Sequence, residues 1–427
     1  MKKAKRMTAA VLAVCMLAGV TLGAVGCSGK KEIVFWNPFS GPDGETMQAM
    51  VDKFNETDPE YTIKNVSMAG DDMYTKIPTV INSGKNIPDM GIVHFFRIPL
   101  YASENMVVPI ESYIAGQPEI KEENYIETAW QFGDFNGQRY SVPLDMTGWV
   151  TYYNVDLVEK YAPHVLDDQL LTLDEVMEIG EAAAKDGVYA FGGANFFVEQ
   201  FMAYLAQMGT ELSVEDKPNI DTKEAREIIQ KMKDIYASGY SSKIGDDNFN
   251  LFISNKIIFN PEGTWTANAL NKEDYPDLNW GETNTMALDN QTMLNWMSSH
   301  QFVVYNNTGE KEDVKAAKAE VMGAFIAFVR ENSGEWANAG HIPASIQAAS
   351  GTDFESKPQA IFMSSDEEKE SLTLPNYTYF GYISGALYGV MQDILTDKLP
   401  VDDGLAKAQA EVSDKIAEHA KAAEAQK

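Results

Sequence analysis

The sequence predicts an α/β protein of two lobes, and three observations support this fold class. Segments with helical periodicity alternate with short apolar segments along most of the chain. Its 427 residues are enough for two domains or for one large domain. We find neither an internal repeat nor a low-complexity linker that would separate two independent halves. Two lobes with crossing connections therefore fit the sequence better than two domains in tandem.

The first part of the chain contains strand–helix–strand units. An apolar strand at 33–36 ends in a Pro/Gly loop, and residues 45–61 then place apolar side chains at helical spacing. An extended segment at 62–68 completes a βαβ unit, which implies parallel pairing and a right-handed crossover. Residues 73–95 repeat this order, with Asp89 interpreted as a turn residue rather than a ligand contact.

Clear helices and short strands are also predicted further along the chain. One helix lies within 221–240 and begins with a cap at Asp221 or Thr222. Two more lie within 318–332 and 402–427, and short strands are expected at 254–259 and 301–306. The strand at 254–259 is expected to end at "FNPEGTW", residues 259–265. In that stretch we expect Gly263 to let the backbone turn.

Residues 1–26 predict a secretory signal. Four basic residues open the chain, and residues 7–25 are small or apolar without an acidic group. The tetrapeptide "AVGC" that follows resembles the lipobox of bacterial lipoproteins, although Ala24 stands where that motif most often has Leu. We therefore expect Cys27 to be lipidated and to become the mature N-terminus. The alternative is ordinary secretion with Cys27 left as a free thiol.

Composition narrows the possible partners. Cys15 is removed with the signal, so no disulfide can form within one mature chain, and a large core must hold the fold. The formal net charge of −29 repels phosphate backbones and anionic lipid headgroups, which argues against nucleic acid as a partner. Membrane contact is therefore expected through the lipid anchor at Cys27. Charge alone leaves a basic ligand possible.

The usual motifs of catalysis and cofactor binding are absent from the sequence. Its five histidines form no H-x-x-x-H pair, so we predict no zinc site. There is no G-x-S-x-G elbow, no G-x-G-x-x-G and no complete P-loop, and no cofactor is predicted. A hydrolase that uses two carboxylates leaves no local signature. The sequence therefore does not exclude a catalytic role for Glu262 as an acid.

Aromatic residues are abundant, with 20 Phe, 19 Tyr and 7 Trp. Most of them are expected in the core, and for any single residue the core is the preferred interpretation. Nine, however, have polar, loop-like neighbours: Trp36, Phe39, Trp149, Phe196, Phe197, Trp265, Trp296, Tyr379 and Phe380. Sugar rings present apolar faces and a rim of hydroxyls, which aromatic side chains among polar groups can bind. As a group, these residues favour a carbohydrate site.

Five segments in order resemble one known family. They are "IVFWNPFSGPDGETMQAMVDKFNETDPEYTIKNV", "IPTVINSGKNIPDM", "NGQRYSVPLDMTGWVTYYNVDLVEKY", "SNKIIFNPEGTW" and "AGHIPAS". Together they are similar to the extracellular solute-binding proteins of ABC importers, specifically the sugar-binding group that includes maltose-binding protein. The chain departs from that pattern at Glu262, Thr264 and residues 298–300. These departures bear on the ligand rather than on the fold.

The resemblance implies a type II periplasmic-binding-protein-like fold with a ligand cleft between two lobes and several hinge crossings. After the signal at 1–26, lobe 1 would comprise 27–142 plus 302–342, and lobe 2 would comprise 143–301 plus 343–427. It further implies a monomer without catalysis, anchored at the outer face of the membrane, that closes on a carbohydrate. The closed form would then be recognised by the permease subunits of an ABC transporter.

Carried over by position, the resemblance implies one set of ligand-binding residues. The set is Trp36, Asn37, Phe39, Asp43, Met146, Trp149, Asn195, Phe196, Gln200, Glu262, Trp265, His300, His341 and Tyr379. Trp265 is the expected stacking platform, and Glu262 a neighbouring hydrogen-bond acceptor. For His341 the alternative is a turn residue beside Pro343. Two other functions stay open, a glycoside-processing enzyme that uses Glu262 and a receptor for a polyamine or peptide.

Overall fold

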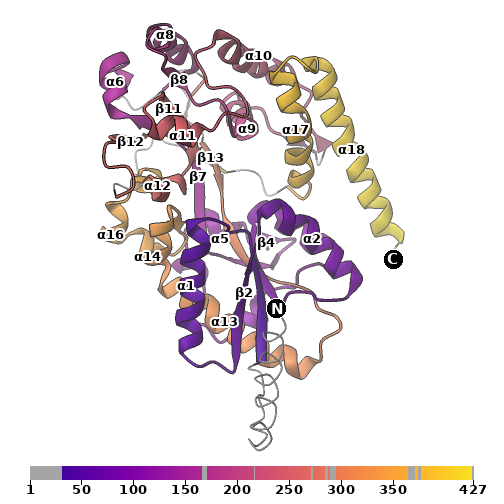
Figure 1. The fold of residues 1–427 in the computed structure, drawn as a ribbon. Helices are drawn as coiled ribbons and strands as arrows, with labels where there is room; N and C mark the ends of the chain where they lie inside the picture. Colours follow the sequence, from indigo (N-terminus) through magenta and orange to yellow (C-terminus); the bar gives the residue numbers. More distant parts are fainter. Residues whose placement is uncertain are drawn as a thin grey trace, which may run out of the picture. The chain divides into compact units, whose positions relative to one another are not determined.

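Two β-sheets organise the chain in the computed structural model (Figure 1). The structure describes residues 31–165, 171–215, 217–270, 273–283, 287–288, 295–363, 371–373 and 377–425. The expected signal segment 1–26 and Cys27 lie outside the described residues. Residues Glu32–Lys427 form one compact unit.

The first sheet has five strands in the order β2-β1-β3-β14-β6. They are β2 (Tyr61–Ser67), β1 (Lys31–Asn37), β3 (Met90–His94), β14 (His300–Val304) and β6 (Ser141–Pro143). Strands β1 and β3 are parallel, whereas β14 pairs antiparallel with both β3 and β6. The late strand β14 therefore completes a sheet that the first part of the chain begins.

Short and long helices accompany the first sheet. They are α1 (Pro42–Glu56), α2 (Gly70–Ser83), η1 (Phe95–Arg97), α3 (Ile98–Ser103), α4 (Glu111–Ile114), η2 (Glu122–Asn124), α5 (Glu127–Gln131), α13 (Glu312–Glu331), α14 (Ser333–Trp336), η3 (Ala337–Ala339), α15 (Ile346–Ala349), α16 (Thr352–Glu355) and η4 (Pro358–Met363). A small hairpin joins β4 (Asp134–Phe135) to β5 (Gln138–Arg139). Apolar side chains of α1 and α13 pack with those of β1 in one core, as with Met50, Phe325 and Phe35.

The second sheet is arranged around one long strand, β7 (Asp145–Asn154). Five further strands pair with it directly or through a neighbour: β8 (Tyr189–Phe191), β11 (Ile257–Gly263), β12 (Trp280–Thr283), β13 (Asn295–Ser298) and β16 (Ser371–Thr373). The two-residue β15 (Ile342–Pro343) pairs with the first residues of β7. Strands β11, β12 and β13 all run antiparallel to β7, and β8 runs parallel to β11.

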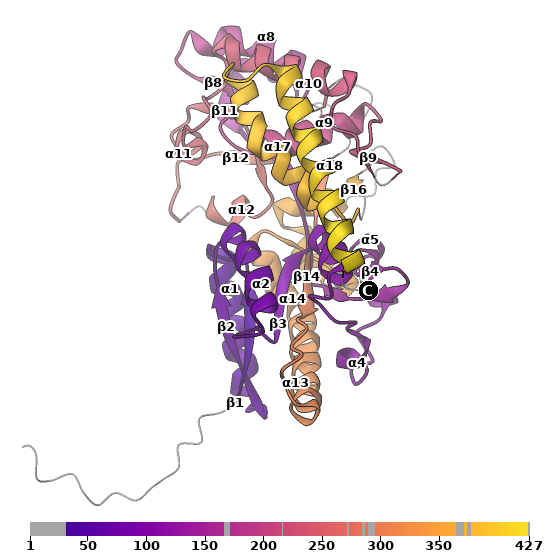
Figure 2. The same ribbon diagram turned by 90° about the vertical axis from the view of Figure 1, so that its right-hand side faces the viewer.

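Eight helices and one small hairpin accompany the second sheet among the described residues. They are α6 (Val155–Tyr161), α8 (Leu173–Ala184), α9 (Phe197–Gln207), α10 (Lys223–Ser238), α11 (Asn248–Ile253), α12 (Thr266–Ala269), α17 (Phe380–Leu395) and α18 (Val401–Ala425), with the hairpin β9 (Ser213–Val214) and β10 (Lys217–Pro218). Helices α17 and α18 lie side by side (Figure 2). Thr222 caps α10 by accepting a hydrogen bond from the Ala225 amide, as the sequence predicts.

The chain passes from one sheet to the other at single residues. Leu144 lies between β6 and β7, and Ser299 lies between β13 and β14. The backbone amide of Leu144 donates to the carbonyl of His300 at 2.8 Å, so the two passages are hydrogen-bonded to each other. The predicted α/β fold with two lobes is confirmed. The predicted boundaries at 142, 302 and 343 remain predictions; Ala344 and Phe354 pack in the core of the first sheet.

The prediction for the stretch 259–265 is wrong in two respects. Strand β11 does not end before Pro261 but continues to Gly263, where it still pairs with β7. Strand β8 pairs only with Ile257 and Phe259 of β11. Pro261 lacks an amide hydrogen, but at Pro261 β8 no longer pairs with β11, so no hydrogen bond to β8 is lost. Gly263 does not turn the backbone. A Cβ there would lie 2.2 Å from the Trp265 ring, so the glycine makes room for the indole.

Among the residues that the structure describes, no helix combines the length and apolar character needed to cross a membrane.

Candidate functional site

A cavity of about 530 Å³ lies between elements of the two sheets. From the first sheet and its helices it is lined by Gly70 and Tyr74 of α2, by His94 at the end of β3, and by Phe96 and Arg97 directly after it. From the second it is lined by β7, β13, α9 and α17 and by Trp265. Its volume is within the range of pockets that hold small ligands. This cavity is the candidate binding site.

Four aromatic rings form one wall of the cavity. The Trp149 ring is central, with its centroid 3.9 Å from that of Phe196, 5.6 Å from that of Trp265 and 5.9 Å from that of Trp296. Trp149 is on β7, and Trp296 is on β13, which pairs antiparallel with β7. Three residues predicted from the sequence, Trp149, Phe196 and Trp265, thus come together here. The wall offers flat apolar faces to a ligand.

Phe196 adopts a backbone conformation that costs energy. Its φ is 58° and its ψ 23°, in the left-handed region that a bulky residue rarely occupies. Residues held in such conformations persist where the surrounding structure requires them, and the cost is about 1–3 kcal/mol. Here the conformation lies directly before α9 and directs the phenyl ring against Trp149. The strain therefore serves the aromatic wall.

One face of α17 lines the cavity with small side chains. Gly381, Ser384, Gly385 and Tyr388 recur at helical spacing and all line it. The Tyr388 hydroxyl donates a hydrogen bond to Glu199 Oε1. Burial raises the pKa of the Glu199 carboxyl, and the Tyr388 hydrogen bond only partly opposes that rise. This face supplies the hydroxyls of Ser384 and Tyr388, and the neighbouring α9 supplies the carboxyl of Glu199.

The residues at the end of β3 supply the other polar groups. The Arg97 guanidinium lies over the Tyr74 ring, with Cζ 4.4 Å from the ring centroid. The Tyr74 hydroxyl is hydrogen-bonded to His94 Nδ1 and also accepts the His94 backbone amide at 3.1 Å. Burial holds the pKa of His94 well below its usual value, with the nearby His300 and Arg97 acting in the same direction. His94 is therefore a neutral hydrogen-bonding group at neutral pH.

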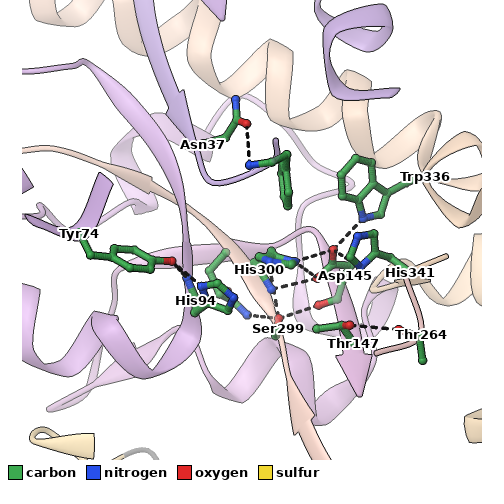
Figure 3. Close-up of polar contacts among 12 residues, drawn as sticks. Asn37, Tyr74, His94, Asp145, Thr147, Thr264, Ser299, His300, Trp336 and His341 are labelled. Atoms are coloured by element: carbon green, nitrogen blue, oxygen red, sulfur yellow. Dashed lines mark hydrogen bonds and ion pairs between the residues drawn. The ribbon is translucent and has the colours of Figure 1, made fainter. Parts of the chain in front are cut away.

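Behind His94, a buried polar cluster surrounds Asp145 at the start of β7 (Figure 3). Asp145 is fully buried. Its Oδ1 accepts the His300 backbone amide at 2.9 Å, and its Oδ2 accepts Trp336 Nε1 at 2.7 Å. His300 Nδ1 lies 2.9 Å from the same Oδ2, and His341 Nδ1 lies 3.6 Å from it. Two predicted site residues, His300 and His341, thus meet at one carboxylate beside both passages between the sheets.

Charge in this cluster resides on Asp145. Burial alone would raise the pKa of Asp145, yet the His300 and His341 side chains and the hydrogen bonds from His300 bring it down to about 2. Burial lowers the pKa of His341 to about 4. Neither ring nitrogen of His341 has a hydrogen-bond partner among the described residues. At neutral pH the cluster therefore holds one carboxylate and a neutral His341.

The same cluster is the one group of described residues that could hold a metal ion. Ligand atoms of Asp145, His300 and His341 all lie within 4.8 Å of one another, and two imidazoles with a carboxylate suit a transition metal. The absence of H-x-x-x-H spacing therefore does not exclude a metal, because these ligands come from distant parts of the chain. Both oxygens of Asp145 already accept hydrogen bonds, so the carboxylate is satisfied without an ion.

Glu262 lies beside this site rather than in the cavity lining. It is 7 % exposed on β11, opposite Val150 of β7. Burial raises the pKa of its carboxyl to about 7, and the hydrogen bond from Asn195 Nδ2 to Oε1, at 3.5 Å, only weakly opposes that rise. Asn195 and Glu262, both predicted from the sequence, are therefore partners. Their chemistry is that of a buried acid close to its titration point at neutral pH.

Two predicted residues from the first loop have local structural contacts. Asn37 is buried, donates to Asn65 at 2.5 Å and accepts the Phe39 amide. The carboxylate of Asp43 accepts the backbone amides of residues 41 and 44 at the start of α1. Phe39 packs against the Asp145 cluster, with its ring centroid 4.8 Å from those of both His300 and Trp336. None of these three lines the cavity.

The other predicted residues lie outside the cavity lining as well. Trp36 packs against the core beneath α2, and Met146 is buried where β7 pairs with β15. Gln200 is buried on α9. Tyr379 lies at the start of α17, where its hydroxyl is 3.2 Å from His419 Nδ1 of α18. Whether any of these contacts a ligand stays a prediction.

Several lining residues were not singled out from the sequence, namely Tyr74, His94, Phe96, Arg97, Glu199, Met202, Ser384 and Tyr388. One signal could have identified Arg97, because it is the single charged residue in "HFFRIPL", directly after a buried strand. Asp145 and Trp336 gave no such signal. Their contact spans 191 positions and has no local pattern.

The chain belongs to the bacterial extracellular solute-binding proteins, because the model of that family matches residues 49–361. Membership places it outside the cytoplasm and assigns it the binding of a solute. A binding protein of Brucella abortus (strain 2308) is 23 % identical over 313 residues, covering 70 % of this chain and 74 % of its own length. A relative in Brucella suis biovar 1 matches to the same extent.

Solved structures of the same fold cover most of the chain. The GacH receptor of Streptomyces glaucescens, solved unliganded and with acarbose, has a TM-score of 0.75 at 16 % identity, covering 89 % of this chain and 97 % of its own. Maltose-bound MalE3 of T. maritima also has a TM-score of 0.75 at 16 % identity, with 90 % and 99 % covered. A Listeria monocytogenes substrate-binding protein in complex with cycloalternan reaches 0.73 at 19 % identity, with 91 % and 99 % covered.

Proposed function

We propose that the protein is an extracytoplasmic receptor that binds a carbohydrate and delivers it to the permease of an ABC transporter without catalysis. The aromatic wall carries this proposal. Trp149, Phe196, Trp265 and Trp296 present flat apolar faces within one cavity of about 530 Å³, opposite hydroxyl, carboxyl and guanidinium groups. This combination suits a sugar, because a sugar ring has apolar faces and a rim of hydroxyls. The sugars bound by the GacH receptor, MalE3 and the Listeria protein point in the same direction.

Delivery to a permease requires that binding change the protein. Elements of both sheets line the cavity, and single residues, Leu144 and Ser299, connect the sheets. A ligand that contacts residues of both sheets binds the closed arrangement more tightly than the open one, and so shifts the equilibrium toward closure. We propose that closure around the sugar is the signal to the permease, and that the receptor acts as a monomer.

Retention at the cell surface is proposed through Cys27. The basic start, the apolar segment and the "AVGC" motif of the sequence support lipidation at this cysteine. A lipid anchor would hold the receptor close to the permease at the outer face of the membrane. Mass spectrometry of the protein isolated from membranes tests it: a diacylglyceryl group on an N-terminal Cys27 is expected, and an unmodified Cys27 would contradict the proposal.

One observation favours a second candidate function, a glycoside-processing enzyme. The pKa of Glu262, about 7, is in the range that suits a general acid. Glu262, however, does not line the cavity, and its carboxyl is held by Asn195. A receptor for a polyamine or a peptide is the third alternative, supported only by the negative net charge.

A panel of oligosaccharides separates these functions. The mature chain is incubated with each sugar, its melting temperature is followed, and the solution is then analysed for products. A sugar at 100-fold over its Kd should stabilise the folded state by about 2.7 kcal/mol and be recovered unchanged. Recovery of cleaved sugar would favour the enzyme. A melting temperature that no sugar raises, but a polyamine or peptide does, would favour the third alternative.

A further inference from the structure

The guanidinium of Arg97 lines the cavity without a partner for its hydrogen-bond donors. Its Nε is buried and has no hydrogen-bond partner. The rings of Tyr74 and Phe96, with centroids 4.4 and 5.4 Å from Cζ, hold the group in place by cation–π attraction. Aromatic rings offer no lone pairs to the five N–H groups of an arginine. The two rings therefore hold the Arg97 guanidinium in place but do not satisfy its hydrogen-bond donors.

Two of the three other described arginines meet carboxylates, and Arg330, outside the cavity, does not. Arg139 pairs with Asp134 at 2.8 Å, and Arg226 pairs with both Asp221 and Asp402. No hydrogen bond or ion pair of this kind is made by Arg97 within the described ranges, although the chain as a whole carries a net charge of −29. A partly buried cation without a partner is costly, and a carboxylate is the group that best matches the planar guanidinium. The missing partner is thus an anion.

The neighbouring end of α17 adds to the positive potential at Arg97. A Cβ on Gly381, the second residue of α17, would lie 3.1 Å from Arg97 Nη1, so the guanidinium lies against the first turn. That turn has no acidic residue, and the side chain of its N-cap residue does not cap the helix. The N-terminal end of a helix is itself positive. Arg97 and the helix end therefore repel each other unless a negative group lies between them.

We propose that the ligand is an acidic carbohydrate, and that Arg97 binds its carboxylate, as in a uronic acid residue. This inference rests on the carbohydrate-binding function proposed above and narrows its substrate class. The sugar ring stacks on the wall that includes Trp149 and Trp265. Tyr388 is seven residues after Gly381 along α17, or about 10 Å, so its hydroxyl and Glu199 receive the uncharged end of the ligand.

The overall charge of the protein does not prevent this binding. Surface carboxylates act over a distance that salt screens to about 8 Å at physiological ionic strength. Inside the cavity the Arg97 guanidinium contacts the ligand directly, in surroundings of lower polarity where the attraction is stronger. The local cation therefore decides which sugars bind, whereas the net charge only slows their approach.

Matched sugars and matched variants test the proposal. The probes are uronic-acid disaccharides of several linkages, each compared with its carboxyl-reduced counterpart, in which the carboxylate is a neutral hydroxymethyl group. Affinities are measured by calorimetry for the wild type, for Arg97→Gln and for Arg330→Gln. Arg330 is a suitable control because its guanidinium also lies over a tyrosine, Tyr125, and has a buried Nε without a partner, but lies outside the cavity.

At least one acidic disaccharide should bind the wild type about 10- to 100-fold more tightly than its reduced counterpart, the range expected of a charged hydrogen bond. Arg97→Gln should abolish that difference and change binding of the reduced sugar by less than about 3-fold, whereas Arg330→Gln should leave it intact. Melting curves confirm that each variant folds, and Arg97→Lys, which keeps the charge, should retain part of the preference.

Three results would overturn the proposal. If reduced sugars bind as tightly as the acids, or if only neutral sugars bind, the ligand is not acidic and the carbohydrate-binding function stands alone. If Arg97→Gln weakens both members of a pair equally, Arg97 contributes to the shape of the cavity rather than to charge recognition. If no sugar of either kind binds the wild type, both the carbohydrate-binding function and this inference fail.

Discussion

Trp336 Nε1 donates a hydrogen bond to Asp145 Oδ2 at 2.7 Å and so joins α14 to the first residue of β7. Asp145 also accepts two donors of His300, the first residue of β14. One carboxylate therefore connects α14 with the first residues of β7 and β14, which directly follow the two passages between the sheets. Its position suits a fixed pivot about which the two lobes could move.

Replacement of Asp145 by Asn should destabilise the protein by about 2–3 kcal/mol, the scale of hydrogen bonds to a charged group. The carboxylate is fully buried, and its donors hold it ionised, with a pKa of about 2. The NH2 group of an asparagine would face the donor of Trp336 or of His300, and the hydrogen bond at that position would be lost. Chemical denaturation at pH 7 measures the loss.

The pH dependence of the same variant provides a second measurement. The folded-state pKa of Asp145 is lower than its ordinary value of 3.8, so its stabilisation is present above pH 4 and is lost between about pH 4 and pH 2. Asp145→Asn should lack this part of the acid transition. Trp336→Phe, which removes one donor and keeps an aromatic ring, should lose less stability. Equal stability of Asp145→Asn and the wild type would contradict the assigned role.

Trp265→Ala should abolish ligand binding with only a small loss of stability. The indole is partly buried and faces the cavity, where Gly263 leaves space for it. Trp149, by contrast, is 3 % exposed at the centre of the wall. Trp149→Ala should therefore weaken binding and also cost about 3–5 kcal/mol, as large-to-small changes in a core do. If Trp265→Ala melts early while binding persists, Trp265 is a core residue.

Gly385→Leu should block the cavity and leave the fold intact. Gly385 lies on the lining face of α17, and a Cβ built there meets nothing within 4 Å. Leu is a better helix former than Gly by up to about 1 kcal/mol, so the melting temperature should not fall. Ligand affinity should decrease at least about 10-fold, which corresponds to about 1.4 kcal/mol of binding free energy.

Gly389 provides the matched control for this substitution. It lies one turn further along α17, has equally open surroundings, and is not part of the lining. Gly389→Leu should raise helix propensity to the same extent without changing affinity. Equal affinities of the two variants would show that the ligand does not occupy the space in front of α17.

The fold could be predicted because its signals are local. Helical periodicity, the cap at Thr222 and the βαβ order in the first part of the chain each require only a few neighbouring residues. The strand at 254–259 was predicted too short because a proline normally ends a strand. In β11 the strand continues through Pro261 because β8 has already ended and no longer pairs with it there. Where β8 ends is a property of a partner strand that lies far away in the sequence.

The candidate site divides in the same way. Trp149, Phe196 and Trp265 could be predicted because they stand in segments that resemble the family and have polar neighbours in sequence. The Asp145 cluster could not, because its members are separated by up to 196 positions and each looks like an ordinary residue of a strand or a turn. Arg97 lies between these two cases. Its position after an apolar segment is unusual in the sequence, but only the structure shows that it lines the cavity.

Glu262→Gln should stabilise the protein above neutral pH. Burial raises the folded-state pKa of Glu262 from 4.5 to about 7, so between these values the folded state binds more protons than the unfolded state. Stability due to this residue therefore falls as pH rises from about 4.5 to 7 and stays low at higher pH. Gln has the same shape and no charge. At pH 8 the variant should be more stable by up to about 3 kcal/mol, and at pH 4 nearly equal to the wild type.

The control for Glu262→Gln is the same substitution at Glu181, whose side chain is 74 % exposed. Glu181→Gln should leave the pH profile of stability unchanged. Ligand binding then decides between the two roles of Glu262, since the amide oxygen introduced by Glu262→Gln can still accept the Asn195 hydrogen bond. A receptor should keep its affinity within about 10-fold, because one neutral hydrogen bond is worth about 1 kcal/mol. An enzyme with Glu262 as its acid would instead lose product formation and keep binding, because Gln cannot donate that proton.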